Sequence, residues 1–264
     1  MKALTPRSTV GSDSELLTGP HVVLEALRAG RRRLHRVWMV RAEPGALGEA
    51  IRALAEERGV PVELRLRVDL DRAAKGIPHQ GVLAEAGPFP YGEPEDILAR
   101  AEGAHEVPFL LVLDGIQDPQ NLGAILRTAE AAGAHGLILP RDRAVGVTPG
   151  AVRASAGATE HFPVARVTNL ASWLDRIKGQ GLWVVGADPS AEHVLYRADL
   201  TGPLALVIGA EGRGLRPLVR SRCDTQVRSP LSGGVASLNA SCAAAVCIFE
   251  VIRQRQAAAA RGSD

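Results

Sequence analysis

The sequence predicts two α/β domains, of which the second is built on a parallel sheet. Apolar stretches typical of buried strands alternate with amphipathic stretches typical of helices over most of the 264 residues. A proline-rich stretch between residues 87 and 108 interrupts this alternation, as linkers do. The length is sufficient for two modest hydrophobic cores. We therefore expect a flexible leader over 1–15, a small domain over 16–87, a linker over 88–106 and a larger domain over 107–264.

The first domain is predicted to be a small α/β/α sandwich. Its helical patterns end at glycines, which commonly follow the last turn of a helix. The expected helices cover 22–30, 47–58 and 70–75, and the expected strands cover 37–40, 60–64 and 81–86. One further short helix is expected within the linker, at 96–101.

The second domain shows the stronger alternation. Its strands are expected at 109–113, 136–139, 182–187 and 204–209, and its helices at 121–133, 150–156, 170–177 and from about 240. Continuously apolar strands indicate a parallel sheet covered on both faces. Ligands of such sheets bind beyond the carboxyl ends of the strands. Asp114, Pro140, Asp188 and the glycine-rich 209–214 loop occupy those ends, and Asn121 is expected to cap the helix that begins there.

Composition narrows the class of protein. The chain is 46% hydrophobic and 23% charged with a net charge of +2, as expected of a soluble globular protein without an overall basic field. Its 3 cysteines show no metal-ligand spacing and indicate a reducing compartment. Neither a signal peptide nor an apolar run of membrane-spanning length is present. We expect a cytoplasmic protein with no metal and no membrane association.

Single motifs carry little information here. The 209–214 loop reads G-x-x-G-x-G, which is neither the dinucleotide fingerprint nor a phosphate-binding loop, so a nicotinamide oxidoreductase or a nucleotide hydrolase is disfavoured. Arg127 could pair with Glu130 on one helix face. No nucleophile, histidine and acid occur in a recognisable set.

Three segments taken in order are more informative. Residues 114–129, 207–215 and 237–241 resemble the three motifs of the SpoU-type ribose methyltransferases of the SPOUT superfamily. Residues 19–27 and 79–82 are similar to the RNA-binding N-terminal domain of that family. The resemblance covers about residues 19–255.

The resemblance implies a fold, a cofactor and an activity. It implies a C-terminal parallel-sheet methyltransferase domain with a trefoil knot, a small N-terminal α/β/α RNA-binding domain, and a homodimer. The implied activity is S-adenosylmethionine-dependent 2′-O-methylation of a guanosine ribose in 23S rRNA. The alternatives are another rRNA or tRNA nucleotide, as in thiostrepton-resistance-type or tRNA-modifying relatives, or an RNA-binding ribosome-assembly protein without catalysis.

The resemblance also implies roles for individual residues. The catalytic candidates are Arg127, Asn121, Glu211, Ser237 and Asn239. The cofactor-binding candidates are Ile208, Gly209, Gly212, Ser229, Pro230, Leu231 and Leu238. An arginine is a poor general base because its guanidinium stays protonated, so Arg127 is expected to position and polarise the substrate. Ser229-Pro230-Leu231 stands where the family usually has Ile-Pro-Met. The serine removes apolar cover from the cofactor, which matters little if this segment contacts the cofactor mainly through its main chain.

A cluster of arginines is the candidate RNA-binding surface. It comprises Arg28, Arg31, Arg32, Arg33 and Arg36, extended by Arg65, Arg67, Arg72 and Lys75. A solvated helix end is the commoner explanation for such a cluster. With an RNA substrate implied, these side chains are expected to contact phosphates, which position RNA and do not specify its sequence. Only 3% of residues are aromatic, so base stacking is not expected to dominate recognition.

Overall fold

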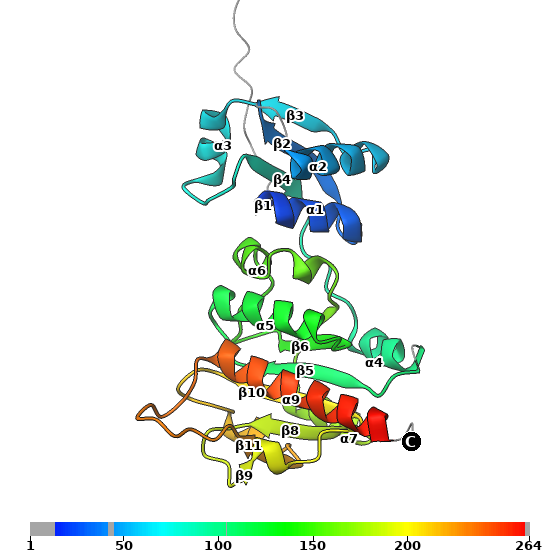
Figure 1. The fold of residues 1–264 in the computed structure, drawn as a ribbon, viewed down its shortest axis with the longest axis vertical. Coiled ribbons are helices and arrows are strands. Elements are labelled where there is room, and N and C mark those ends of the chain that lie inside the picture. The colour runs from blue at the N-terminus through cyan, green and yellow to red at the C-terminus, as the bar shows by residue number, and fades with distance from the viewer. Residues whose placement is uncertain (1–13, 42–44, 104, 262–264) are drawn as a thin grey trace, which may run out of the picture. The chain divides into compact units, whose positions relative to one another are not determined.

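The chain folds into two units, each with its own sheet (Figure 1). The computed structural model describes residues 14–41, 45–103 and 105–261. The first unit is Met1–Pro90 together with Ala156–His161, and the second is Tyr91–Ser155 together with Phe162–Asp264. The boundary near residue 90 lies at the start of the predicted linker.

The first unit is a four-stranded mixed sheet with helices on both faces. The strand order is β1-β4-β2-β3, with β2 parallel to β3 and antiparallel to β4. The strands are β1 (Glu15–Thr18), β2 (Leu34–Val40), β3 (Val62–Arg65) and β4 (Val82–Ala86), and the helices are α1 (Pro20–Ala29), α2 (Ala46–Glu57) and α3 (Arg67–Ala74). Trp38 and Leu83 pack against Leu70 of α3 on one face, and α1 and α2 lie on the other (Figure 1). The predicted α/β/α arrangement is confirmed.

Two parts of the first unit were not predicted from the sequence. Residues Glu15–Thr18, at the start of the predicted domain, form β1, which pairs with β4 at the sheet edge where no strand was predicted. Residues Ala156–His161, which lie between two elements of the second unit, contain a 3₁₀ turn, η1 (Ala158–Glu160), that contacts α1. Gly157 has a φ of 90°, and a Cβ there would come within 2.8 Å of the Glu25 Cβ, so the approach requires glycine.

The second unit is built on a seven-stranded sheet in the order β7-β6-β5-β10-β8-β11-β9, in which every pairing is parallel. The strands are β5 (Phe109–Asp114), β6 (Gly136–Pro140), β7 (Val164–Val167), β8 (Trp183–Ala187), β9 (His193–Val194), β10 (Leu204–Gly209) and β11 (Thr225–Arg228). The helices are α4 (Pro94–Gly103), α5 (Pro119–Ala131), α6 (Pro149–Ala154), α7 (Leu170–Lys178), α8 (Pro217–Arg220) and α9 (Ala240–Arg261), with a 3₁₀ turn η2 (Leu195–Arg197). The predicted parallel sheet is confirmed.

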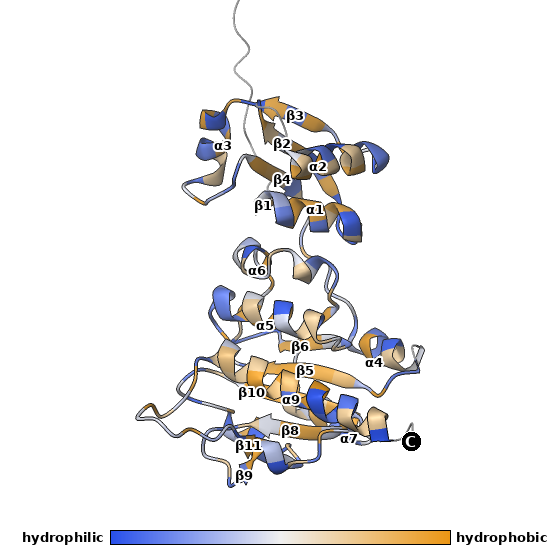
Figure 2. Ribbon diagram, in the orientation of Figure 1, coloured by the Kyte–Doolittle hydropathy of each residue, from blue (hydrophilic) through white to orange (hydrophobic). Residues whose placement is uncertain are grey.

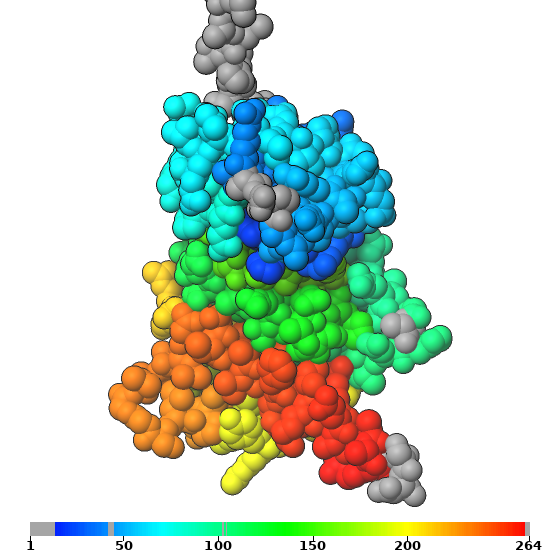
Figure 3. Space-filling model, turned by 45° about the horizontal axis from the view of Figure 1, so that its top comes forward, coloured from blue at the N-terminus to red at the C-terminus, as the bar shows by residue number. Residues whose placement is uncertain are grey.

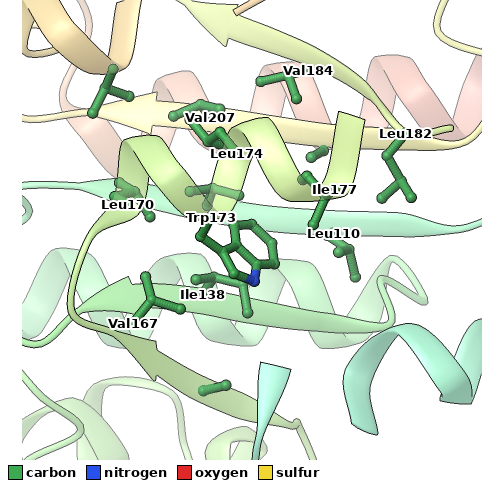
Figure 4. Packing of buried hydrophobic residues seen from close by; sticks show 14 of the residues in the cluster. Leu110, Ile138, Val167, Leu170, Trp173, Leu174, Ile177, Leu182, Val184 and Val207 are labelled. Carbon is green, nitrogen blue, oxygen red and sulfur yellow. The ribbon is translucent and has the colours of Figure 1, made fainter. Parts of the chain in front are cut away.

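Alternate side chains of the strands fill two cores. On one face Trp173 of α7 is buried with Leu110, Ile138 and Leu174, and Figure 4 shows its indole among them. On the other face α5 and α9 pack against each other, and α6 packs on α5. Strands β5 and β10 are apolar along almost their whole length, as Figure 2 shows, because both of their faces are covered by helices.

The predicted linker contains a helix that belongs to the second unit. Helix α4 buries Ile97 in the core cluster of Trp173, where its side chain lies so close to Gly136 that a Cβ there would come within 2.5 Å. Residues from Tyr91 onward therefore pack with the sheet of the second unit. The domain limits of the sequence analysis remain a prediction.

Candidate active site

A cavity of about 500 Å³ opens at the carboxyl ends of β8, β10 and β11. The ends of these strands, the 209–214 loop and several residues between Ser229 and Ala240, which lead into α9, form most of its wall. In Figure 3 the orange segment before α9 and the red helix itself lie on the surface of the second unit. This is the edge at which an open parallel sheet binds its ligand.

Most of the predicted cofactor-binding residues line this cavity. Those that do so are Ile208, Gly209, Gly212, Ser229, Leu231 and Leu238, together with the predicted catalytic residues Glu211 and Ser237. Pro230, in contrast, is exposed and is not part of the wall. Segments separated by some twenty residues thus meet at one site.

The 209–214 loop closes tightly on itself. The Ala210 and Gly214 main chains exchange two hydrogen bonds, of 3.1 and 2.9 Å. A Cβ at Gly209 would lie 2.3 Å from the Gly214 carbonyl carbon, so no other residue fits there. Glycine at this position therefore allows the loop to fold back over the end of β10 and form one wall of the cavity.

Asn121, Glu211 and Asn239 form a hydrogen-bonded cluster. The Asn239 Nδ2 donates to Asn121 Oδ1 at 3.0 Å and to Glu211 Oε2 at 3.3 Å, and Asn121 Nδ2 donates to the same Glu211 oxygen at 3.5 Å. Each residue comes from a different predicted motif. All three remain at least partly accessible, so their polar groups can also bind a ligand.

Two caps place the asparagines of this cluster. Asn239 Oδ1 accepts from the Ser241 main-chain N–H at 2.9 Å and therefore caps α9. Helix α5 begins differently from the prediction, because Asp118 is its N-cap and Pro119 its first residue. The prediction that Asn121 caps this helix is wrong. Its amide, one turn inside, is instead directed to Glu211.

Arg127 lies apart from this cluster. It follows Asn121 by six residues on α5, which places it about 9 Å along the axis and about 120° around it. It is exposed, it is not part of the cavity wall, and among the described residues it forms no ion pair, including the one with Glu130 that the spacing allowed. The guanidinium is therefore free to act on a ligand outside this cavity wall.

An ion pair that the sequence did not reveal completes the cavity. Asp188, at the end of β8, pairs with Arg220 of α8, and its other oxygen accepts from the Ser190 N–H at 2.9 Å and the Ser190 hydroxyl at 2.6 Å. Burial raises the pKa of Asp188, but the Ser190 hydrogen bonds and Arg220 outweigh it and hold the pKa below its usual value. The position of Asp188 at the end of a predicted strand was the one sequence feature that could have suggested this ion pair. No sequence feature pointed to Arg220.

Cys247 contributes a thiol to the same cavity. Burial raises its pKa to about 12, although a hydrogen bond with Ser229 lowers it. The thiol is thus protonated at neutral pH and acts as a small apolar filler. Ser229, for which the family resemblance led us to expect isoleucine, is thus hydrogen-bonded within the protein.

The arginine cluster of the first unit is largely neutralised. The Arg32 side chain is fully buried, with ion pairs to Glu15 at 2.8 Å and to Glu160 at 3.0 Å. Burial raises the pKa of Glu160, and the Arg32 charge lowers it. Arg36 pairs with Glu85 at 2.7 Å. We correct the prediction that Arg32 contacts RNA, because its guanidinium is out of reach of a phosphate.

The remaining members of the cluster are more accessible. Arg28 pairs with Glu25 at 2.7 Å, and Arg31 donates to the main-chain oxygen of Glu160 at 3.4 Å. Arg33 is exposed. The RNA-binding roles of Arg28, Arg31 and Arg33 stay predictions.

Comparison with known proteins gives the relationship. Residues 108–249 match the SpoU rRNA Methylase family, and residues 16–92 match the RNA 2′-O ribose methyltransferase substrate binding family. The chain belongs to the SpoU rRNA methylase family. It is 44% identical to the 23S rRNA (guanosine-2′-O-)-methyltransferase RlmB of Pseudomonas putida over 93% of this chain and 98% of that protein. RlmB of Photorhabdus laumondii is also 44% identical, over 92% of this chain and 99% of that protein.

A solved structure of the SpoU family shows the same architecture. The SpoU methyltransferase AviRb of Streptomyces viridochromogenes, in complex with AdoMet, superposes with a TM-score of 0.78 at 27% identity, covering 93% of this chain and 92% of that chain. AdoMet is S-adenosylmethionine, the cofactor that the family resemblance implies for this chain. The cavity fits such a molecule, because its volume is within the range of small-molecule sites and its wall combines apolar residues such as Ile208, Leu231 and Leu238 with polar and charged ones.

Two further surveys cover the described residues. No group of three or more His, Cys, Asp or Glu side chains among them is placed to hold a metal ion. None of the helices in the described part of the chain has the length and apolar character needed to cross a membrane.

Proposed function

We propose that this chain transfers a methyl group from S-adenosylmethionine to the 2′-oxygen of a guanosine ribose in 23S rRNA. The observation that carries the proposal is the meeting of Asn121, Glu211 and Asn239 beside the cavity that the 209–214 and 229–240 segments enclose. The near full-length identity to RlmB proteins supports the choice of substrate.

The methyl transfer requires few functional groups from the protein. The O–H bond of the ribose 2′-hydroxyl would break with its proton passing to solvent, and a bond would form between that oxygen and the methyl carbon. The bond between sulfur and this carbon would break, so that sulfur leaves as a neutral thioether. Bound S-adenosylmethionine supplies the methyl group as an already good electrophile. The protein must align the hydroxyl in line with this carbon and help remove the proton, which are effects of orientation and of polar contacts.

The cluster beside the cavity has the groups for this alignment. Glu211 offers a carboxylate acceptor, and the amides of Asn121 and Asn239 offer donors and acceptors. Their mutual hydrogen bonds hold them in place before RNA arrives. Gly209, Ser237 and Leu238 line the cavity, which supports our proposal that they contact the cofactor.

We propose that the enzyme is a homodimer and that Arg127 acts beside the cavity of the partner subunit. Arg127 is exposed and unpaired among the described residues, yet it lies away from the cavity of its own chain. Phe249 on α9, which packs against α5, is 52% exposed, whereas its neighbour Ile248 is buried. An exposed aromatic ring and an unpaired arginine, on two helices that pack against each other, suit an interface.

The trefoil knot and the cytoplasmic location belong to the same proposal. The knot is proposed from membership of the SpoU family, since the close approach of Gly209 to Gly214 belongs to a single tight turn. An rRNA substrate implies that the enzyme acts where ribosomes are made.

The test is transfer of labelled methyl groups to unmodified 23S rRNA. We expect incorporation at one guanosine, which primer extension at low nucleotide concentration would locate. A 2′-deoxyguanosine at that position should abolish transfer. Calorimetric binding of S-adenosylmethionine with no transfer to any RNA would contradict the proposal and favour a non-catalytic RNA-binding protein.

A further inference from the structure

Backbone strain gathers in the loop that joins α3 to β4, residues 75–81, which we call the His79 loop. Lys75, the left-handed C-cap of α3, and Gln80 have φ values of 50° and 49°, and both carry a Cβ that disfavours this region. Gln80 has no helix end to account for it. Gly76 and Gly81, with φ of 82° and 84°, accompany them. Proteins keep such strain where the surroundings impose it, and these positions concentrate at ligand sites.

His79 imposes the conformation of Gln80. Its imidazole is buried, with Nδ1 accepting from the Gly81 N–H at 3.0 Å and Nε2 lying 2.8 Å from Asp71 Oδ1. Nε2 therefore carries the proton and donates it to the carboxylate. The Val82 N–H donates to the His79 carbonyl at 3.0 Å, which closes a turn with positive φ at both central residues. That is the type I′ pattern, in which glycine or asparagine is usual at the place of Gln80.

The Gln80 side chain has no structural use that would explain this strain. It is exposed, and its amide forms no hydrogen bond with another described residue. A donor and an acceptor are thus presented to solvent on a turn that is clamped from beneath by a buried histidine.

Three basic side chains near the His79 loop are not held in ion pairs as Arg32 and Arg36 are. The Val40 N–H donates to the Gly81 carbonyl at 2.9 Å, so the loop lies at the carboxyl end of β2, where Arg41 is exposed. Arg67 and Lys75 are also exposed, and none of the three has an ion-pair partner among the described residues. The arginine cluster begins at the other end of this strand, about 20 Å away at roughly 3.3 Å per residue.

We propose that the His79 loop reads the RNA substrate, with the Gln80 amide hydrogen-bonding an unpaired base and Lys75 contacting an adjacent phosphate. An amide can bond the donor and acceptor edge of one base at once. Bases exposed in RNA loops are the ones that proteins read in this way. The inference rests on the proposed function, since it takes RNA as the substrate. It assigns a base contact to the end of β2 opposite Arg28, Arg31 and Arg33, and it retains Lys75 from the predicted RNA-binding surface.

The decisive variant is Gln80→Gly. It should relieve backbone strain, and so not lower the melting temperature, whereas it should weaken RNA binding if the Gln80 amide contacts a base. Glycine adopts positive φ without a Cβ penalty, so the melting temperature should stay equal to or rise above that of the wild type. RNA affinity should nevertheless fall roughly tenfold with loss of the base contact. Affinity is measured on the full-length protein by fluorescence anisotropy with a labelled 23S rRNA fragment that contains the methylated loop, in the absence of S-adenosylmethionine.

Two further variants sharpen the test. His105→Gly is the matched control, because His105 is another exposed residue with φ of 56°, and it should leave affinity unchanged. Lys75→Gly should lower the slope of log affinity against log salt by about one, as loss of one phosphate contact does.

The outcomes separate this inference from the proposed function. Wild-type affinity of Gln80→Gly, or a fall shared equally by His105→Gly, would overturn the role of the His79 loop even if methyl transfer proceeds. Affinity that depends on Gln80, found without any methyl transfer, would support the loop and contradict the enzyme. A wild type that does not bind the RNA would overturn both.

Discussion

Arg32 of the first unit is buried with a carboxylate on either side, whereas Asn121, Glu211 and Asn239 of the second unit bond to one another and stay accessible. Both groups join residues that are far apart in the chain. The ion pairs of Arg32 tie β1 and the 156–161 segment to the sheet, so these polar atoms stabilise the fold and are not available to a ligand. The second leaves polar groups available at the mouth of a cavity.

The difference shows what distinguishes a structural polar cluster from a functional one. Density of like charge along the sequence pointed to the arginines, yet Arg32 and Arg36 are held by glutamates from other strands and segments. Availability after folding, and not abundance in sequence, decides whether a polar group can bind a ligand.

The largest effect should come from breaking the buried cluster. Arg32→Ala would leave Glu15 and Glu160 unpaired, and loss of one partner of a buried ion pair costs about 3–5 kcal/mol. Arg28→Ala, which removes an exposed pair three residues apart, should cost less than about 1 kcal/mol. Urea unfolding of both variants measures the difference. Equal losses would show that the two arginines do not differ in role.

The second largest effect is expected for Arg127→Ala, which tests whether this exposed arginine takes part in methyl transfer. We expect a roughly 100-fold lower kcat for methyl transfer, the scale seen for loss of a single polar group that stabilises a transition state. The melting temperature should not change, because the side chain is exposed and unpaired among the described residues. Arg127→Lys should recover only part of the rate, because lysine keeps the positive charge but lacks the planar guanidinium that can donate two parallel hydrogen bonds. Normal turnover by Arg127→Ala would contradict the role.

The cavity wall can be tested through its glycines. Gly209→Ala should destabilise the protein by about 1–3 kcal/mol through overpacking and abolish S-adenosylmethionine binding by calorimetry. Gly233→Ala is the matched control on the same wall, because nothing lies within 4 Å of its Cβ position and it should bind normally. Similar binding by both variants would mean that the tight loop does not shape the cofactor site.

The smallest effect is the pH dependence of Asp188. Its pKa is lowered in the folded state, so ionised Asp188 stabilises the fold above the ordinary aspartate pKa of about 4, and this contribution is lost as pH falls below that value. The difference in unfolding free energy between wild type and Asp188→Asn should be constant from pH 5 to 8 and shrink toward pH 3. A difference that grows on acidification would contradict the assignment.

Much of the second unit was predictable because its signals are local. Strands β5 and β10 are buried on both faces and therefore read as continuous apolar runs. The start of α5 was misplaced, since Asp118 and Pro119 form a stronger helix start than Asn121. β1 was missed because four residues at a sheet edge give too short a pattern.

Local patterns were enough to predict the alternation of elements, the glycines that permit tight loops, and the order of three motifs that indicates the family. These are properties of single segments or of their order, and they can be seen without knowledge of contacts. Which polar groups remain available depends instead on the folded chain. It placed Glu160 against Arg32, Arg220 against Asp188, and Asn239 against Asn121, because partners up to 128 residues apart are chosen by the packing of the chain, which no local pattern encodes.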